Sequence, residues 1–358
     1  RTSPKMEVNF DQKVENGHFY KDTVLATFTV SETNFDPKRM QITGTYNNKA
    51  EEFPGLSSWV KQGDSYIATM RFTQNGDYTV NVTGSDKAGN TLTSYSSRFN
   101  IDKKAPEISV NDVKPANNSK EIRPRIVFTD SNLDKDSISI TLNGVNRGDD
   151  LDFSGELVEI PDGYEYVFDN IPDKEVFDDI YTVKATVKDK AGNTSDRDYQ
   201  FSVNRFGSTF MLDDSSQAIA GKYISKPQDI IIKEFNTDKH TGENTVVITR
   251  DNEMQKLEEG KGFTIEESGG DNEWKEYTYI IPSEVFDADG RYTVSVHTTD
   301  EAGNINISAS PKKQAELQFY VDKTEPLCIP LNITDNGAYK GESHIARLSV
   351  SDNIMLKN

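Results

Sequence analysis

The chain has 358 residues, a formal net charge of −19 and a mean hydropathy of −0.69. The excess of acidic residues repels phosphate backbones and anionic membrane surfaces, which argues against a nucleic-acid partner. No apolar run is long enough to cross a membrane, and one cysteine cannot form a disulfide within the chain. We expect this cysteine, Cys328, to be a buried thiol that packs as a small hydrophobic side chain.

Three near-identical turns recur along the chain, at residues 86–90, 189–193 and 300–304. Each reads Asp, then Lys or Glu, then Ala-Gly-Asn, and each follows a segment that a tyrosine opens. The three tyrosines, Tyr78, Tyr181 and Tyr292, recur at intervals of about one hundred residues, which is typical of small sandwich domains and too long for a solenoid repeat. The sequence therefore predicts a series of similar units.

A hairpin is predicted at the end of each unit. After the tyrosine, valine or alanine alternates with polar residues, as in a half-buried strand. In the turn, aspartate accepts from backbone N–H groups, glycine takes a positive φ, and asparagine tolerates the left-handed region. We expect structural roles for the turn residues Asp86, Gly89, Asn90, Asp189, Gly192, Asn193, Asp300, Gly303 and Asn304.

Short joints follow the hairpins. Residues 102–106 and 322–326 end in proline, which restrains the backbone and predicts a stiff joint. Residues 204–208 carry a glycine and no proline, which predicts a looser or differently angled connection. The predicted domains are residues 1–103, 104–204 and 205–323, with 324–358 as the first part of a fourth, so we expect the chain to be a fragment of a longer protein.

The predicted fold class is all-β, with tandem Greek-key sandwiches of about seven short strands each. The tyrosine-led strand, the Asp-x-Ala-Gly-Asn turn and the Asp-Lys-x-x-Pro joint resemble tandem bacterial immunoglobulin-like domains. Such domains occur on secreted and wall-anchored proteins, especially of Gram-positive bacteria. The resemblance implies an extracellular location, and it implies that Tyr78, Tyr181 and Tyr292 are tyrosine-corner residues whose hydroxyls bond nearby backbone groups.

The sequence contains no recognisable catalytic motif. There is no phosphate-binding glycine loop, no nucleophile elbow and no Cys or His pair at metal spacing, and we expect the four histidines to be exposed. We therefore predict no enzyme activity and no cofactor. Calcium is the alternative, because oxygen ligands gather in three segments and a site that joins the first of them to Asp102 would stiffen the first joint. Solvated, turn-forming aspartates explain these segments equally well. The segments contain Asp130, Asn132, Asp134 and Asp136, then Asp149, Asp150 and Asp152, then Asp213 and Asp214.

Two functions fit these observations. The first is a monomeric, non-catalytic stalk of a surface protein that presents a head domain away from the cell. The second is a set of modules that bind a glycan or a host protein, appended to a secreted carbohydrate-active enzyme. A sugar-stacking surface of Trp274, Tyr277 and Tyr279 would support the second function, while core packing or cover of a strand edge also explains these rings.

Overall fold

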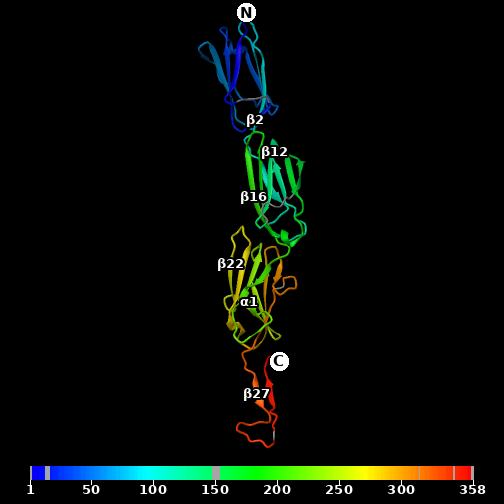
Figure 1. The fold of residues 1–358 in the computed structure, drawn as a ribbon. Helices are drawn as coiled ribbons and strands as arrows, with labels where there is room; N and C mark the ends of the chain where they lie inside the picture. The colour runs from blue at the N-terminus through cyan, green and yellow to red at the C-terminus, as the bar shows by residue number, and fades with distance from the viewer. Residues whose placement is uncertain (1, 13–16, 147–153, 314, 342, 356–358) are drawn as a thin grey trace.

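Three β-sandwiches follow one another in a row, and a two-stranded sheet comes after them (Figure 1). The computed structural model describes residues 2–12, 17–146, 154–313, 315–341 and 343–355. We call the sandwiches unit 1, unit 2 and unit 3, and the last sheet segment 4. The prediction of tandem all-β sandwiches is confirmed.

Unit 1 packs a sheet of order β1-β3-β6-β5 against a sheet of order β2-β8-β7-β4. Both sheets alternate buried and exposed residues, as expected where one face packs and the other meets water. The elements are β1 (Lys5–Phe10), β2 (His18–Tyr20), β3 (Val24–Ser31), the 3-10 turn η1 (Pro37–Arg39), β4 (Met40–Tyr46), β5 (Val60–Gln62), β6 (Ser65–Phe72), β7 (Gly76–Gly84) and β8 (Tyr95–Ile101).

Unit 2 repeats this arrangement with the sheets β13-β14-β11-β9 and β10-β16-β15-β12. The tyrosine-led strand and the strand after the turn form an antiparallel pair, as predicted. The elements are β9 (Glu107–Asn111), β10 (Ala116–Asn117), β11 (Arg125–Thr129), β12 (Leu133–Gly144), β13 (Gly155–Ile160), β14 (Gly163–Phe168), η2 (Glu175–Phe177), β15 (Asp179–Asp189) and β16 (Thr194–Val203).

Unit 3 has the sheet β17-β19-β23-β22 and the sheet β18-β26-β24-β20-β21, in which β25 also pairs with β24. A short helix, α1, lies between its first two strands. The elements are β17 (Thr209–Leu212), α1 (Asp214–Ile219), β18 (Tyr223–Ile224), β19 (Ile230–Asn236), β20 (Thr245–Arg250), β21 (Glu253–Leu257), β22 (Thr264–Ser268), β23 (Lys275–Ile281), η3 (Ser283–Phe286), β24 (Gly290–Thr299), β25 (Ile305–Ile307) and β26 (Leu317–Val321).

One pairing recurs in all three units. The short strands β2, β10 and β18 run parallel to β8, β16 and β26, the last strand of their own unit. The first long strand of each unit instead joins the other sheet. The entering chain is thus shared between both sheets of the sandwich.

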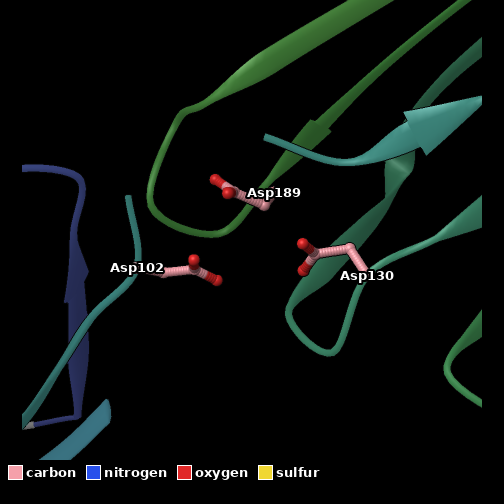
Figure 2. Close-up of side chains that lie close together, drawn as sticks. All are labelled: Asp102, Asp130 and Asp189. Atoms are coloured by element: carbon pink, nitrogen blue, oxygen red, sulfur yellow. The ribbon is translucent and has the colours of Figure 1, made fainter. Parts of the chain in front are cut away.

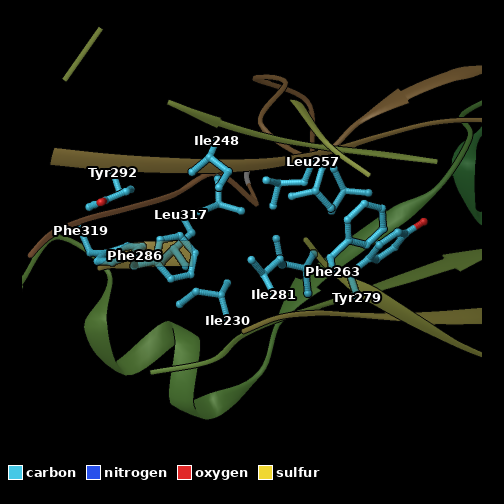
Figure 3. Close-up of a cluster of buried hydrophobic side chains, with 14 of the residues drawn as sticks. Ile230, Ile248, Leu257, Phe263, Tyr279, Ile281, Phe286, Tyr292, Leu317 and Phe319 are labelled. Carbon is cyan, nitrogen blue, oxygen red and sulfur yellow. The ribbon is translucent and has the colours of Figure 1, made fainter. Parts of the chain in front are cut away.

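Each unit has its own hydrophobic core. In the described residues, the three clusters of buried side chains draw on unit 1, unit 2 and unit 3 separately. Figure 3 shows the cluster of unit 3, in which Phe286, Tyr292 and Phe319 lie together. Separate cores mean that each unit gains its stability from its own burial.

Segment 4 consists of β27 (Leu327–Pro330) paired with β28 (Leu348–Ser351). In the described residues no second sheet covers this pair, and its side chains are exposed. Cys328 lies on β27 and is exposed. The expectation that its thiol is buried is wrong, because the sheet pair provides no opposite layer to pack against.

Candidate functional site at the joints

Buried polar side chains at the joints form hydrogen bonds between one unit and the next. Joint 1 is residues 102–106, joint 2 is residues 204–208 and joint 3 is residues 322–326. Each follows the last strand of one unit and leads into the first strand of the next (Figure 1).

Three carboxylates converge at joint 1. Asp102 follows β8 of unit 1, while Asp130 follows β11 and Asp189 ends β15, both in unit 2. Their oxygens lie within 4.8 Å of one another, and Figure 2 shows the side chains turned toward a common centre. Asp102 and Asp189 are 6% and 3% exposed, and Asp130 is half-buried. Among the described residues, this is the group with the spacing to hold a metal ion.

Two asparagines of unit 2 bind this joint. Asn132 donates its side-chain amide to Asp102 Oδ2 at 2.6 Å and its backbone N–H to Asp130 Oδ1 at 2.6 Å. Asn193, from the repeated turn, donates its amide to Asp189 Oδ2 at 2.6 Å and to the Asp102 carbonyl at 2.8 Å. The hydrogen bonds therefore connect unit 1 directly to two loops of unit 2.

Electrostatic repulsion opposes this arrangement. Burial, and then the charges of Asp102 and Asp189, raise the pKa of Asp130 above its ordinary value. Three carboxylate oxygens are ligands that calcium prefers, so a divalent cation would balance the charge. Protonation of Asp130 would relieve the repulsion as well.

We expect Asp130→Asn to stabilise joint 1 slightly at pH 7 in a chelator, by about 1 kcal/mol or less after solvent screening. Because the folded-state pKa of Asp130 is raised, its contribution to stability is complete below about pH 4 and is lost as pH rises through the raised value. The gain from the substitution should therefore shrink as the solution is acidified. Thermal unfolding at several pH values measures it.

Asp134→Asn is the control, because Asp134 is a half-buried residue of the same segment that lies outside the group of three carboxylates. A loss of stability in Asp130→Asn at pH 7 would contradict the repulsion. Calcium that stabilises the wild type but not Asp130→Asn would show that the three carboxylates hold a cation in solution.

Joint 2 carries an amide where joint 1 carries a carboxylate. Asn204, only 1% exposed, donates its side-chain N–H groups to Asn236 Oδ1 at 2.8 Å, Asp238 Oδ2 at 2.9 Å and Asp300 Oδ2 at 3.1 Å. The turn residue Asn304 donates to the Asn204 carbonyl at 2.8 Å, as Asn193 does at joint 1. Asn204 and Asn304 therefore contribute neutral amide donors to this joint.

Arg205 fixes joint 2 to unit 2. Its guanidinium donates to the carbonyls of Ser119 at 2.8 Å, Ile171 at 2.8 Å and Pro172 at 3.0 Å, and its side chain is 3% exposed. The next residue, Phe206, donates its backbone N–H to Asp178 Oδ2 at 2.7 Å, and burial raises the pKa of Asp178 to about 6.

The sequence predicts a looser or differently angled connection at joint 2, and the contacts across the joint contradict the looser one. Gly207 does take a positive φ of 69°, as expected of a glycine in place of proline. The buried side chains on either side of it nevertheless bind both units. Backbone freedom at one residue is overridden by these contacts.

Trp274 also contacts the preceding unit. Its indole N–H donates to Asp179 Oδ1 of unit 2 at 2.9 Å. Tyr277 and Tyr279 are 3% and 0% exposed and belong to the core of unit 3. A surface of three stacked rings is therefore not formed, and the part-buried Trp274 lies at the contact between units.

The three tyrosines occupy equivalent places. The hydroxyls of Tyr78, Tyr181 and Tyr292 donate to the carbonyls of Gln74 at 3.0 Å, Phe177 at 2.8 Å and Ala288 at 2.9 Å, always four residues earlier. All three rings are buried. This is the geometry that the resemblance to immunoglobulin-like domains implies.

The repeated turns share their hydrogen bonds as well. Asp86, Asp189 and Asp300 each accept the backbone N–H of the asparagine four residues later, at 2.8 to 2.9 Å. The glycines Gly89, Gly192 and Gly303 have φ between 86° and 89°. In units 2 and 3 the turn asparagine additionally reaches the preceding joint, which local turn chemistry does not require.

The remaining acidic and histidine residues divide into several environments. Asp213 caps α1 by accepting from Ser216 N at 2.9 Å, while Asp149, Asp150 and Asp152 lie outside the described residues. His18 and His344 are exposed, and His297 is half-buried. His240 contradicts the expectation of exposure: its side chain is 6% exposed, it stacks on Tyr277 and it lies 3.1 Å from Glu234 Oε1.

Sequence comparison matches part of the chain to a family. A model of the bacterial Ig-like domain (group 3) matches residues 64–204, which include β6 to β8 of unit 1, joint 1 and all of unit 2. Over these residues the chain carries the bacterial Ig-like domain. Domains of this family are typical of extracellular bacterial proteins, and the family supports a non-catalytic surface-protein module.

Other comparisons add little to this bacterial Ig-like assignment. A comparison with curated proteins gives no significant match. Among solved structures, a marsupial T cell receptor aligns with a TM-score of 0.25 and 8% identity, over 84% of this chain and 99% of that one. At that TM-score the likeness says nothing about how the Ig-like units are arranged. In the described residues, no helix is both long and apolar enough to span a membrane.

Proposed function

We propose that this chain is a non-catalytic stalk of a bacterial surface protein, which acts as a monomer and presents a head domain away from the cell. The observation that carries this proposal is the set of hydrogen bonds across joints 1 and 2, which bind consecutive units end to end. A spacer needs this property, because freely jointed units would fold back on one another.

Direct binding of a glycan or host protein has less support. The rings that motivated it are divided between the core of unit 3 and the contact with unit 2. The stalk function requires no cofactor, and a cation at Asp102, Asp130 and Asp189 would only stiffen joint 1 further.

Small-angle scattering tests the stalk. A single compact globule of this length has a radius of gyration of about 21 Å. We expect the full chain to give roughly twice that value, with the profile of an elongated particle. A radius close to that of the globule would reject the proposal, and Trp274→Ala in parallel reports whether its contact with unit 2 contributes to the extension.

A further inference from the structure

The loop directly after β3, β11, β19 and β28 holds one equivalent position in each unit. We define this docking position as the residue of that loop whose backbone N–H donates to the side chain two residues before it. The bonds are Asn34 to Glu32 at 2.8 Å, Asn132 to Asp130 at 2.6 Å, Asp238 to Asn236 at 2.8 Å, and Ile354 to Asp352 at 2.9 Å. The shared place in the loop and the shared hydrogen bond make these residues structurally equivalent.

The docking position pairs with the first residue of the joint. At joint 1 the amide of Asn132 donates to the carboxylate of Asp102 at 2.6 Å. At joint 2 the amide of Asn204 donates to the carboxylate of Asp238 at 2.9 Å. Acid and amide have exchanged places, and the hydrogen bond is kept.

Joint 3 lacks this pair. Its first residue is Asp322, and the docking position of segment 4 is Ile354, which has no side-chain donor. Asp322 Oδ1 is buried and has no hydrogen-bond partner among the described residues. The neighbouring amide of Asn353 donates elsewhere, to Asp289 Oδ2 at 2.8 Å. An unmatched docking position thus coincides with one unsatisfied carboxylate oxygen.

We propose that this acid–amide pair is the element that holds two consecutive Ig-like units in one relative orientation. A unit that ends in aspartate docks onto a unit with asparagine at the docking position, and a unit that ends in asparagine docks onto a unit with aspartate there. A mismatch places two carboxylates, or a carboxylate and an apolar side chain, in the contact, which costs free energy. Complementary side chains thereby fix how units dock whose order the chain already sets.

The test uses the full chain with Asn132→Asp, with Asp102→Asn and with both. Asn132→Asp adds a fourth carboxylate beside Asp102, Asp130 and Asp189, and Asp102→Asn in the same chain recreates the pair of joint 2. Spin labels on T43C and K184C, with C328S, report the distance between units 1 and 2 by double electron–electron resonance. We expect a distance distribution at least twofold broader in Asn132→Asp, and the wild-type width in the double variant.

Asn34→Asp is the matched control. It changes the docking position of unit 1, where Glu32 and Asp86 take the places of Asp130 and Asp189 but the exposed Asn34 side chain meets no other unit among the described residues. It should keep the wild-type width. Equal broadening in this control, no broadening in Asn132→Asp, or a double variant as broad as Asn132→Asp would each overturn the proposal.

Joint 2 supplies the mirror experiment if Asn132→Asp unfolds unit 2. Asn204→Asp should broaden the distance between units 2 and 3, and Asp238→Asn in the same chain should restore it. Failure of that rescue would also reject the pairing. The acid–amide pairing deepens the proposed stalk function and rests on it. The two proposals are nevertheless rejected by different results. Scattering from a compact particle rejects the stalk, and a failed rescue rejects the pairing.

Discussion

Replacing Arg205 by methionine is expected to lower the free energy of unfolding of unit 2 by about 3–5 kcal/mol, because three carbonyls lose the charged hydrogen-bond donor that they share. The carbonyls of Ser119, Ile171 and Pro172 would lose their donors inside the contact. Methionine keeps the apolar volume of the side chain, so the effect reports the lost hydrogen bonds rather than a cavity. Chemical denaturation with hydrogen exchange read over residues 119–123 and 168–173 measures it.

Arg205→Lys separates charge from geometry. Lysine keeps the positive charge, but its single ammonium cannot reproduce the planar fork that reaches three carbonyls. We expect it to recover less than half of the loss. A lysine variant as stable as the wild type would show that charge alone holds the joint, and an unchanged Arg205→Met would contradict the role given to these bonds.

Replacing Glu234 by alanine is expected to destabilise unit 3 by about 3–4 kcal/mol, from unsatisfied donors and the cavity together. Glu234 is 0% exposed and accepts from Tyr279 Oη at 2.7 Å, Thr298 Oγ1 at 2.8 Å and Ser208 Oγ. Burial, followed by the charge of Glu234, raises the pKa of the Tyr279 hydroxyl. These three hydroxyls would lose their common acceptor. Thermal unfolding of the full chain, assigned to unit 3 by hydrogen exchange, measures the loss.

Glu234→Gln is the conservative comparison. Glutamine keeps the volume and one acceptor oxygen, so we expect a loss of about 1–2 kcal/mol. A carboxylate at this position is particular to unit 3. The strand registers identify the corresponding residues as Val30, opposite Tyr66, in unit 1 and Phe128, opposite Tyr164, in unit 2. An alanine variant that costs less than the glutamine variant would show that the carboxylate is not the organising group.

The alternating strands and the repeated turns could be predicted from the sequence, because both depend on residues close together in the chain. Val80, Val183 and Val294 are buried, as the period of two requires. The same period places Glu234 inward, two residues after Ile232, but hydrophobicity alone does not indicate a buried carboxylate. Its three hydroxyl partners come from joint 2, β23 and β24, which are distant in the sequence, so their meeting could not be predicted locally.

The joints show where local reasoning fails. A site that joins Asp102 to the acidic segment near Asp130 was among the alternatives that the sequence offered, whereas the participation of Asp189 depends on the fold of the hairpin. At joint 2, Gly207 indicated freedom, and the contacts of Asn204 and Arg205 outweigh it. Cys328 has apolar neighbours in the sequence, but it is exposed because no second sheet covers β27 in the described residues.

The parallel pairing of β2 with β8, β10 with β16 and β18 with β26 has a mechanical consequence. Once a pull on both ends of the chain reaches one of these short strands, it draws that strand and the last strand of the unit in opposite directions along their length. The hydrogen bonds between them are then loaded in shear, all at once, instead of being peeled apart one by one. These parallel pairs therefore resist tension by shear.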